Sequence, residues 1–277
     1  MTVPGLRAAK VASGHPPLVA VTAYDAPGAR MADEAGVDVI LVGDSVAMVV
    51  LGHEDTLQVT VADLAHHTAA VARTSPRALV VADLPWPSYH VTVPGAVRNA
   101  ATLVRAGASA VKLEGGRKRV PVVTAIVDAE VPVMGHLGLT PQSVHVMGGY
   151  KVQGRGPAAA QALVDDALAL VAAGVFAIVL EGIPAATASQ VTEAVPVPTI
   201  GIGAGPHCDG QVLVSHDLLG LGEGPVPRFV RRYADLRSAG VAALTAFATD
   251  VRSGSFPSDE ESYGAPITGG RAANMAR

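Results

Sequence analysis

Eight short apolar segments recur along the chain, and segments with helical spacing of apolar residues lie between most of them. Strands buried in a parallel sheet have continuous apolar sequences of this length, whereas helices place apolar residues at intervals of three and four. The alternation therefore predicts a series of β–α units. The eight expected strands span residues 18–24, 37–43, 78–84, 110–116, 131–138, 175–182, 198–205 and 212–218.

Eight such units without a break in composition favour an α/β fold, a closed (β/α)8 TIM barrel that forms a single domain over residues 1–254. An open, doubly wound parallel sheet is the alternative. Residues 139–156 match no regular element and are expected to form a long glycine-rich loop, and one or two helices are expected in 228–254. The tail, residues 255–277, is polar, and we expect its last dozen residues to lack fixed structure.

The composition excludes several classes of protein. The chain of 277 residues is 49% hydrophobic and 16% charged, which is enough apolar material for one large core. Its net charge of −4 argues against a nucleic-acid partner. The single cysteine, Cys208, forbids an internal disulfide and suits a reducing compartment. We find no signal peptide and no apolar stretch that could span a bilayer, so we expect a soluble, cytoplasmic protein without a membrane partner.

Ionisable residues stand at or just past the ends of five expected strands, at the rim where a TIM barrel carries its active site. Burying an unpaired carboxylate costs on the order of several kcal/mol, so charged residues at these positions are expected to have a charged partner or a functional role. Lys112 and Glu114 are two apart in one strand, so both side chains face the barrel axis. Glu181 follows an uncharged segment, and desolvation brings a carboxylate's pKa towards the range of a general base. The five residues are Asp44, Asp83, Glu114, His136 and Glu181.

Each candidate also has a structural explanation. Asp44 could cap a turn, Asp83 could be a buried ion-pair partner, and His136 could be a hydrogen-bonded core residue. Their convergence on one rim favours chemistry instead, because several hard oxygen ligands suit Mg²⁺ better than Zn²⁺. A metal there could chelate a small keto acid and stabilise the enolate that forms when Glu181 removes a proton next to the carbonyl.

At these residues the chain resembles the ketopantoate hydroxymethyltransferase family, over roughly residues 18–263. The motifs that carry the resemblance are VILVGDS, ALVVADLP, AVKLEGG, VPVMGHLGLTPQSVHVMGGYKVQGR, AIVLEGIP and SGSFPSDEESY. The resemblance implies a TIM barrel that moves a hydroxymethyl group from 5,10-methylenetetrahydrofolate to 3-methyl-2-oxobutanoate. The product, 2-dehydropantoate, leads to pantothenate and coenzyme A. The resemblance further implies Mg²⁺ and a homodecamer of two pentameric rings.

The resemblance also implies a role for each candidate. Glu181 takes the position of the family's proton acceptor, and His136 belongs to the same cavity without an assigned role. The family's metal positions fall on Asp44, Asp83 and Glu114. Its keto-acid positions fall on Asp44, Ser45, Asp83 and Lys112.

Three positions depart from the family pattern, and two other functions stay open. Gln58 stands where proline is common, Trp86 stands where a smaller turn is frequent and could alter the pocket wall, and Ser215 replaces a bulky aromatic residue. One alternative function is a metal-dependent lyase related to isocitrate lyase and phosphoenolpyruvate mutase, although the chain lacks the reactive-cysteine loop of those lyases. The other is a barrel that binds a keto acid without catalysis.

Overall fold

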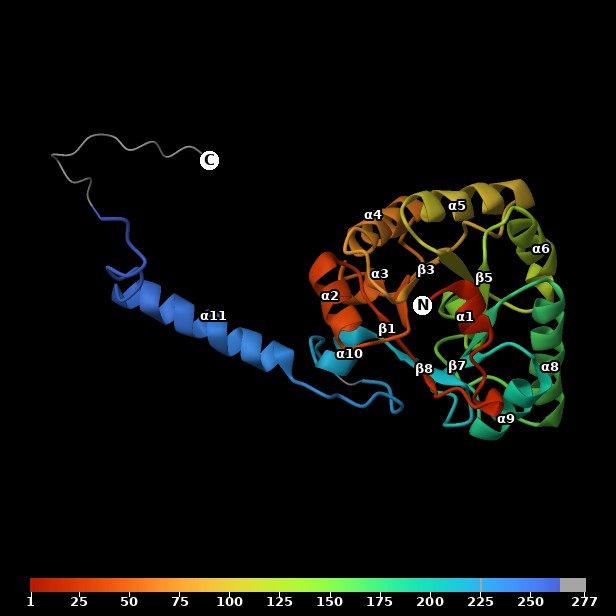
Figure 1. The fold of residues 1–277 in the computed structure, drawn as a ribbon. Coiled ribbons are helices and arrows are strands. Elements are labelled where there is room, and N and C mark those ends of the chain that lie inside the picture. Colours follow the sequence, from red (N-terminus) through yellow and green to blue (C-terminus); the bar gives the residue numbers. More distant parts are fainter. Residues whose placement is uncertain (225, 265–277) are drawn as a thin grey trace.

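The computed structural model describes residues 1–224 and 226–264, and its centre is a closed barrel of eight parallel strands (Figure 1). Each strand pairs with the next along the chain, and β8 pairs with β1 to close the ring. The predicted TIM barrel is therefore confirmed, and the open sheet is excluded. The strands are β1 (Leu18–Thr22), β2 (Val39–Val42), β3 (Leu79–Asp83), β4 (Ala110–Glu114), β5 (Val133–Gly138), β6 (Ala177–Glu181), β7 (Thr199–Ile202) and β8 (Gly210–Leu213).

Helices connect most of the strands on the outside of the barrel, and polar side chains mark where several of them begin. Asp25, Thr60 and Thr92 each accept a hydrogen bond from the backbone N–H three residues later, which satisfies a free donor of the first turn. The α-helices are α1 (Val3–Arg7), α2 (Ala26–Glu34), α3 (Val46–Val49), α4 (Val61–Ala72), α5 (Val93–Arg105), α6 (Val120–Asp128), α7 (Val144–Met147), α8 (Pro157–Ala172), α9 (Ala185–Ala194), α10 (Ser215–Leu219) and α11 (Leu236–Ser253). The 3₁₀-helices are η1 (Val11–Ser13), η2 (Arg117–Arg119) and η3 (Pro141–Ser143).

Alternate residues of the strands build two separate apolar layers, because successive side chains of a strand point to opposite faces. Val39 and Leu41 belong to the layer inside the barrel, which Leu6 of α1 joins at the N-terminal end. Ile40 and Val42 belong to the outer layer, between the strands and the helices. The barrel interior is therefore filled by side chains along most of its length, and space for a binding site is left at its C-terminal end.

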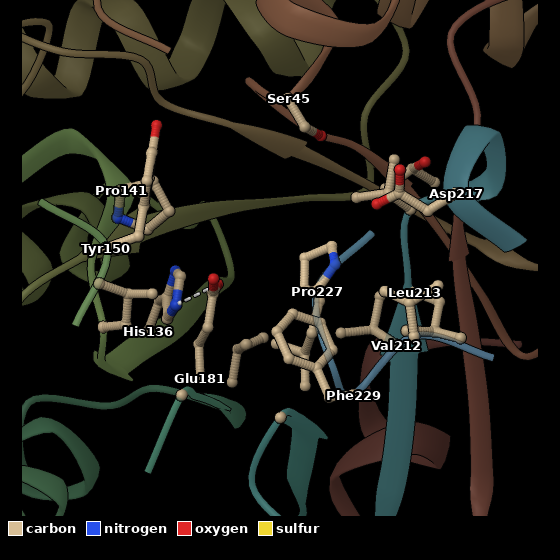
Figure 2. A pocket seen from close by; sticks show the side chains of 18 of the residues that line it. Ser45, His136, Pro141, Tyr150, Glu181, Val212, Leu213, Asp217, Pro227 and Phe229 are labelled. Atoms are coloured by element: carbon tan, nitrogen blue, oxygen red, sulfur yellow. Dashed lines mark ion pairs between the residues drawn. The ribbon is translucent and has the colours of Figure 1, made fainter. Parts of the chain in front are cut away.

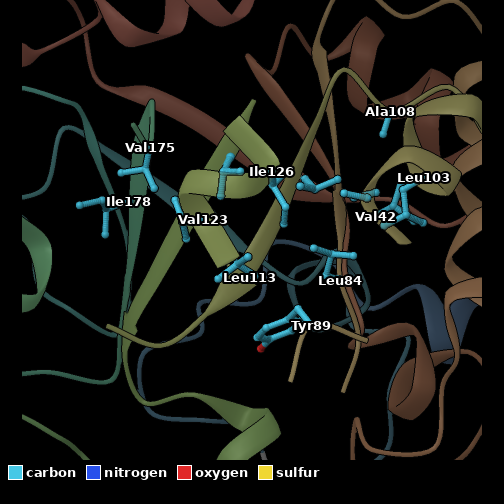
Figure 3. Close-up of a cluster of buried hydrophobic side chains, with 14 of the residues drawn as sticks. Val42, Leu84, Tyr89, Leu103, Ala108, Leu113, Val123, Ile126, Val175 and Ile178 are labelled. Atoms are coloured by element: carbon cyan, nitrogen blue, oxygen red, sulfur yellow. The ribbon is translucent and has the colours of Figure 1, made fainter. Parts of the chain in front are cut away.

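The outer layer holds most of the buried apolar side chains. Figure 3 shows part of it, where Val42, Leu113 and Ile178 of the strands lie in the same cluster as Leu103 of α5 and Ile126 of α6. All five side chains are almost completely buried. This layer fixes the orientation of the strands, and thereby the direction of the inward-facing residues at their ends.

Of two expectations about the connections, one needs correction. The segment 139–156 is not a loop throughout, because it contains η3 and α7, and residue Gln142 within it is buried. The expectation of one or two helices in 228–254 is confirmed by the single helix α11, and the residues before it are irregular. The sequence gives no strong helical period in 139–147, since these turns are only three and four residues long.

The C-terminal part of the described chain leaves the barrel. Helix α11 extends away from it (Figure 1), and no residue of this helix is buried. It ends at Ser253 with Gly254 as its C-cap, so the predicted domain boundary coincides with a helix end but stays a prediction. The expected disorder of the last dozen residues falls outside the described residues. Within residues 1–224 and 226–264, no helix combines the length and the apolar character needed to cross a membrane.

Candidate active site

A cavity of about 990 Å³ opens at the C-terminal ends of the strands (Figure 2). Its wall comes from most of the strands, from the segment 139–152 and from residues 227–230 beyond α10. The structure brings all of the predicted site residues into this wall. They are Asp44, Ser45, Asp83, Lys112, Glu114, His136 and Glu181.

The strand register explains why residues far apart in the sequence meet there. Asp83 of β3 is the direct partner of Lys112 in β4, and Glu114 of β4 is the direct partner of His136 in β5. Glu181 ends β6 opposite Gly138 of β5. Neighbouring side chains that face the barrel axis therefore form a continuous charged row along β3 to β6.

A buried ion pair lies at one end of this row. The Lys112 ammonium is 2.9 Å from Asp83 Oδ1, and Asp83 Oδ2 accepts a hydrogen bond from the backbone N–H of Asp44 at 3.0 Å. Burial alone would lower the pKa of Lys112, but the carboxylates of Asp83 and Glu114 outweigh burial and raise it. Lys112 is therefore a fixed positive charge in the cavity wall.

The carboxylates outnumber the fixed positive charges. The pKa of Asp44 is raised well above its usual value, first by burial and then by repulsion from Asp83 and Glu114. Lys112 opposes this shift but does not remove it. The ionised form of Asp44 is thus disfavoured unless a further cation enters the cavity.

His136 joins the buried row to Glu181. Its Nδ1 lies 3.4 Å from Glu114 Oε1, and its Nε2 lies 3.2 Å from Glu181 Oε2 (Figure 2). Burial and Lys112 lower the pKa of His136, yet the two glutamates outweigh them and raise it to about 9. The expected dry surroundings of Glu181 are found only in part, since its side chain keeps 16% of its exposure. Glu181 therefore faces the cavity, as a group that meets a substrate must.

The sequence reasoning missed Gln142, which connects two of the carboxylates. Its backbone N–H donates to Glu114 Oε2 at 3.0 Å, and its side-chain amide donates to Asp44 Oδ2 at 2.8 Å. The hydroxyl of Tyr89, also buried, donates to Gln142 Oε1 at 2.6 Å. Only the position of Gln142 in the long segment after β5 hinted at a function. A second missed residue is Tyr24, whose hydroxyl is 2.8 Å from Ser45 Oγ.

The donor chemistry of the cavity fits Mg²⁺. The available groups are carboxylate oxygens, and Asp83 Oδ1 is buried without an aligned hydrogen bond in the described part of the chain. Among residues 1–224 and 226–264, no three His, Cys, Asp or Glu side chains are gathered as a ready-made metal cage. Mg²⁺ does not require one, because it keeps several waters and usually takes one or two carboxylates. The ligand assignment to Asp44, Asp83 and Glu114 stays a prediction.

The three departures from the family pattern lie away from the charged row. Gln58 and Trp86 both line a second, smaller cavity of about 300 Å³, so Trp86 does not shape the wall of the main one. Ser215 donates its backbone N–H to Thr22 Oγ1 at 3.0 Å, and Thr22 in turn lines the main cavity. None of the three disturbs a candidate residue.

Comparison with known proteins decides the family. A model of the ketopantoate hydroxymethyltransferase family matches residues 1–259. The chain belongs to this family. A relative from Methylobacterium sp. (strain 4-46) is 58% identical over 265 residues, which cover 96% of this chain and 91% of the relative. One from Moorella thermoacetica (strain ATCC 39073 / JCM 9320) is 56% identical over 264 residues, which cover 95% and 97%. Both are named 3-methyl-2-oxobutanoate hydroxymethyltransferase, so the predicted family and the predicted class, a transferase enzyme, are confirmed.

Solved structures of similar shape extend the comparison of the fold beyond the ketopantoate hydroxymethyltransferase family. Phosphoenolpyruvate phosphomutase from Streptomyces platensis subsp. rosaceus has a TM-score of 0.61 at 17% identity, with 92% of this chain and 88% of that chain covered. For 2,3-dimethylmalate lyase, a member of the PEP mutase/isocitrate lyase superfamily, the TM-score is 0.61 at 21% identity, with 95% and 92% covered. At these identities the likeness concerns the barrel alone.

Proposed function

We propose that this enzyme transfers a hydroxymethyl group to 3-methyl-2-oxobutanoate, with 5,10-methylenetetrahydrofolate as donor, to give 2-dehydropantoate for pantothenate and coenzyme A synthesis. Relatives at 52–58% identity carry the name of this activity. The observation that carries the mechanism is that Glu181 faces the same cavity as the charged row of Asp83, Lys112 and Glu114. Transfer requires a base beside an anion-binding subsite, and this cavity contains both kinds of group.

The keto acid would lie against the buried row. The Lys112 ammonium and the Ser45 hydroxyl, the latter held by Tyr24, would orient the substrate carboxylate. Asp44, Asp83 and Glu114 would hold Mg²⁺. When bound, Mg²⁺ would polarise the keto carbonyl and offset the excess negative charge in the cavity.

Glu181 would act as the base. Its carboxylate takes the proton from C3 of the keto acid, and C3 then attacks the methylene carbon of the donor. The methylene carbon is bonded to two folate nitrogens, so formation of the C–C bond breaks one C–N bond, and a water breaks the other and supplies the hydroxyl of the product. The two nitrogens take up the C3 proton and one proton of the water, which leaves tetrahydrofolate. His136, 3.2 Å from Glu181, holds the carboxylate by its charge. General acid–base groups of this kind contribute about 10²–10⁴-fold to a rate.

The second substrate would occupy the outer part of the cavity. A volume of about 990 Å³ is far more than a five-carbon acid fills. The rim offers aromatic faces at Tyr150 and Phe229 and cations at Lys151 and Arg228. Such a rim suits a flat heterocycle with a carboxylate-bearing tail, which describes the folate donor.

The decisive experiment is to measure product formation from 3-methyl-2-oxobutanoate with Mg²⁺, with and without the folate donor. We expect product only with the donor. Cleavage of a keto acid without folate would instead support the lyase, whose superfamily shares this fold. A barrel that merely binds would give neither product nor exchange of the C3 proton with solvent.

Two expectations about the cellular setting belong to the same proposal. The enzyme would work in the cytoplasm, where a buried free thiol such as Cys208 stays reduced. It would assemble as a homodecamer of two pentameric rings, as the family resemblance implies. Light scattering checks the assembly, because a decamer has ten times the mass of the 28.0 kDa chain.

A further inference from the structure

Tyr89 lies behind the charged row rather than within it. It belongs to the connection between β3 and α5, its side chain is almost completely buried, and its ring packs in the outer apolar layer (Figure 3). The hydroxyl nevertheless accepts a hydrogen bond from the backbone N–H of Glu114 at 3.2 Å and donates to Gln142 Oε1 at 2.6 Å. A single buried hydroxyl therefore joins the segment after β3 to the end of β4 and to the segment after β5.

The hydrogen bonds of the Gln142 amide all have a fixed direction. Because the Tyr89 hydroxyl donates to Oε1, the nitrogen Nε2 faces the other way, where it donates to Asp44 Oδ2 at 2.8 Å and to Leu84 O at 3.0 Å. A backbone carbonyl oxygen can only accept, so an amide turned by half a revolution would set Oε1 against Leu84 O and leave the Asp44 carboxylate without its donor. The Tyr89 hydroxyl thus holds the amide in the orientation that serves Asp44.

Gln142 also contacts a second predicted metal ligand. Its backbone N–H donates to Glu114 Oε2 at 3.0 Å, so this one buried residue contacts Asp44 through its side chain and Glu114 through its main chain. Mg²⁺ requires a nearly ideal octahedral arrangement of its oxygen ligands. A shift of Gln142 would therefore disturb two of the three predicted ligands at once.

Two contacts hold the Tyr89 ring independently of its hydroxyl. The centroids of the Tyr89 and His90 rings are 4.2 Å apart, and the guanidinium carbon of Arg119 lies over the Tyr89 ring, 5.5 Å from its centroid. A cation in this position is attracted to the face of the ring, whether or not the ring carries a hydroxyl. Replacement of Tyr89 by phenylalanine therefore keeps the ring contacts and removes the hydroxyl alone.

We propose that Tyr89 is a positioning residue of the metal site, whose hydroxyl fixes the Gln142 amide and, through it, the placement of Asp44 and Glu114. This role rests on the proposed function, in which those two carboxylates help to hold Mg²⁺. Without the hydroxyl, Gln142 Oε1 is buried with no donor, and an unpaired buried polar atom is costly enough that the side chain turns or shifts to find a partner. Asp44 then loses its donor, although no predicted ligand has been replaced.

Calorimetric titration of the chelator-treated, full-length enzyme with Mg²⁺ tests this role without relying on turnover. Tyr89→Phe should raise the dissociation constant of Mg²⁺ about 10-fold, because loss of an outer partner of a metal ligand typically costs about 10–100-fold in affinity. The matched control is Thr192→Val, which also removes a buried hydroxyl from a hydrogen bond, 2.7 Å long, to Thr199 at the N-terminal end of the barrel. At that distance from the site, the control should change the dissociation constant less than about twofold.

A double variant distinguishes an effect that passes through Gln142 from a general loss of stability. In the Gln142→Leu background the amide is gone, so adding Tyr89→Phe should raise the dissociation constant by less than about threefold. An unchanged constant in Tyr89→Phe alone would overturn the proposal. So would an equal rise in both backgrounds, or a rise in Thr192→Val as large as that in Tyr89→Phe. A native enzyme that binds no Mg²⁺ would show, before any variant is made, that the predicted metal site itself is wrong, and the positioning role of Tyr89 would fall with it.

Discussion

Both ends of the barrel bury charged side chains, but the two clusters differ in how completely their members are paired. At the N-terminal end, Asp209 accepts hydrogen bonds from the backbone N–H groups of Val11 at 3.0 Å and Thr199 at 2.9 Å. Lys10 lies 3.1 Å from the same carboxylate and donates to three backbone carbonyl oxygens near the end of α9. Every charge there has an internal partner.

At the C-terminal end the pairing is incomplete. Asp44, Asp83 and Glu114 are buried with Lys112 and His136, and the pKa of Asp44 is raised because the negative charges repel one another. Asp83 Oδ1 and His136 Nε2 lack an aligned hydrogen bond among the described residues, although each lies within ion-pair distance of an opposite charge, at 2.9 Å from Lys112 and 3.2 Å from Glu181. A buried charge that is fully paired within the protein has a structural role. A buried cluster with an excess of negative charge, and with perturbed pKa values, is typical of a site that binds a ligand or a cation. This difference in pairing distinguishes the structural cluster at the N-terminal end from the candidate active site at the C-terminal end.

The largest effect is expected at Glu181. Glu181→Gln should lower the exchange of the C3 proton of 3-methyl-2-oxobutanoate about 10²–10⁴-fold, because the amide cannot accept that proton. NMR in D₂O with Mg²⁺ follows the exchange. Asp217→Asn is the matched control, since Asp217 lines the opposite side of the same cavity (Figure 2) and should leave exchange nearly unchanged. Equal exchange in Glu181→Gln and the native enzyme would remove Glu181 as the base.

Asp209→Ala should disrupt the fully paired cluster of Lys10 and Asp209 at the N-terminal end of the barrel. It leaves the largely buried Lys10 ammonium without its carboxylate, and we expect a loss of about 3–5 kcal/mol in the free energy of unfolding. Denaturant titration measures it, with turnover per folded molecule preserved. Asp165→Ala is the control, because the Arg117–Asp165 pair is exposed and 3.9 Å long and should be worth less than about 1 kcal/mol. A comparable loss in both variants would mean that the N-terminal cluster carries no special stability.

The sequence predicts the charged residues at the C-terminal end of the barrel much better than the cluster at the N-terminal end. All eight strands were located, because apolar runs bounded by turns are local signals, and Asp44, Asp83, Glu114 and Glu181 stood out as charges at the run ends. The pairing of Lys10 with a residue far along the chain has no local signal. The same holds for the hydrogen bonds of Gln142. Roles that depend on long-range contacts therefore need coordinates.

Gln142→Leu should weaken metal binding at the C-terminal site without replacing a predicted metal ligand. The side-chain amide that orients Asp44 is lost, and loss of such an outer partner typically costs about 10–100-fold in metal affinity or activity. The midpoint of a Mg²⁺ titration of activity should rise by that factor. Gln153→Leu, in the same segment, is the control, because among the described residues its side-chain amide donates to Lys151 O and to no carboxylate. If both variants titrate alike, Gln142 does not position the carboxylates.

The smallest effect should have the opposite sign to that of Asp209→Ala. In chelator-treated protein, Asp44→Asn replaces a carboxyl group whose ionised form is disfavoured by burial and by Asp83, while the amide oxygen still accepts from Gln142. We expect a gain of about 0.5–2 kcal/mol in the free energy of unfolding, together with a loss of activity. The folded pKa of Asp44 lies above its unfolded value, so stability is lost as pH rises from about 4, where Asp44 of the unfolded chain ionises, up to the folded pKa. The gain should therefore vanish at low pH and be largest near neutrality, as denaturation at several pH values would show. A destabilised Asp44→Asn at neutral pH would mean that Asp44, like Asp209, is held as a structural charge.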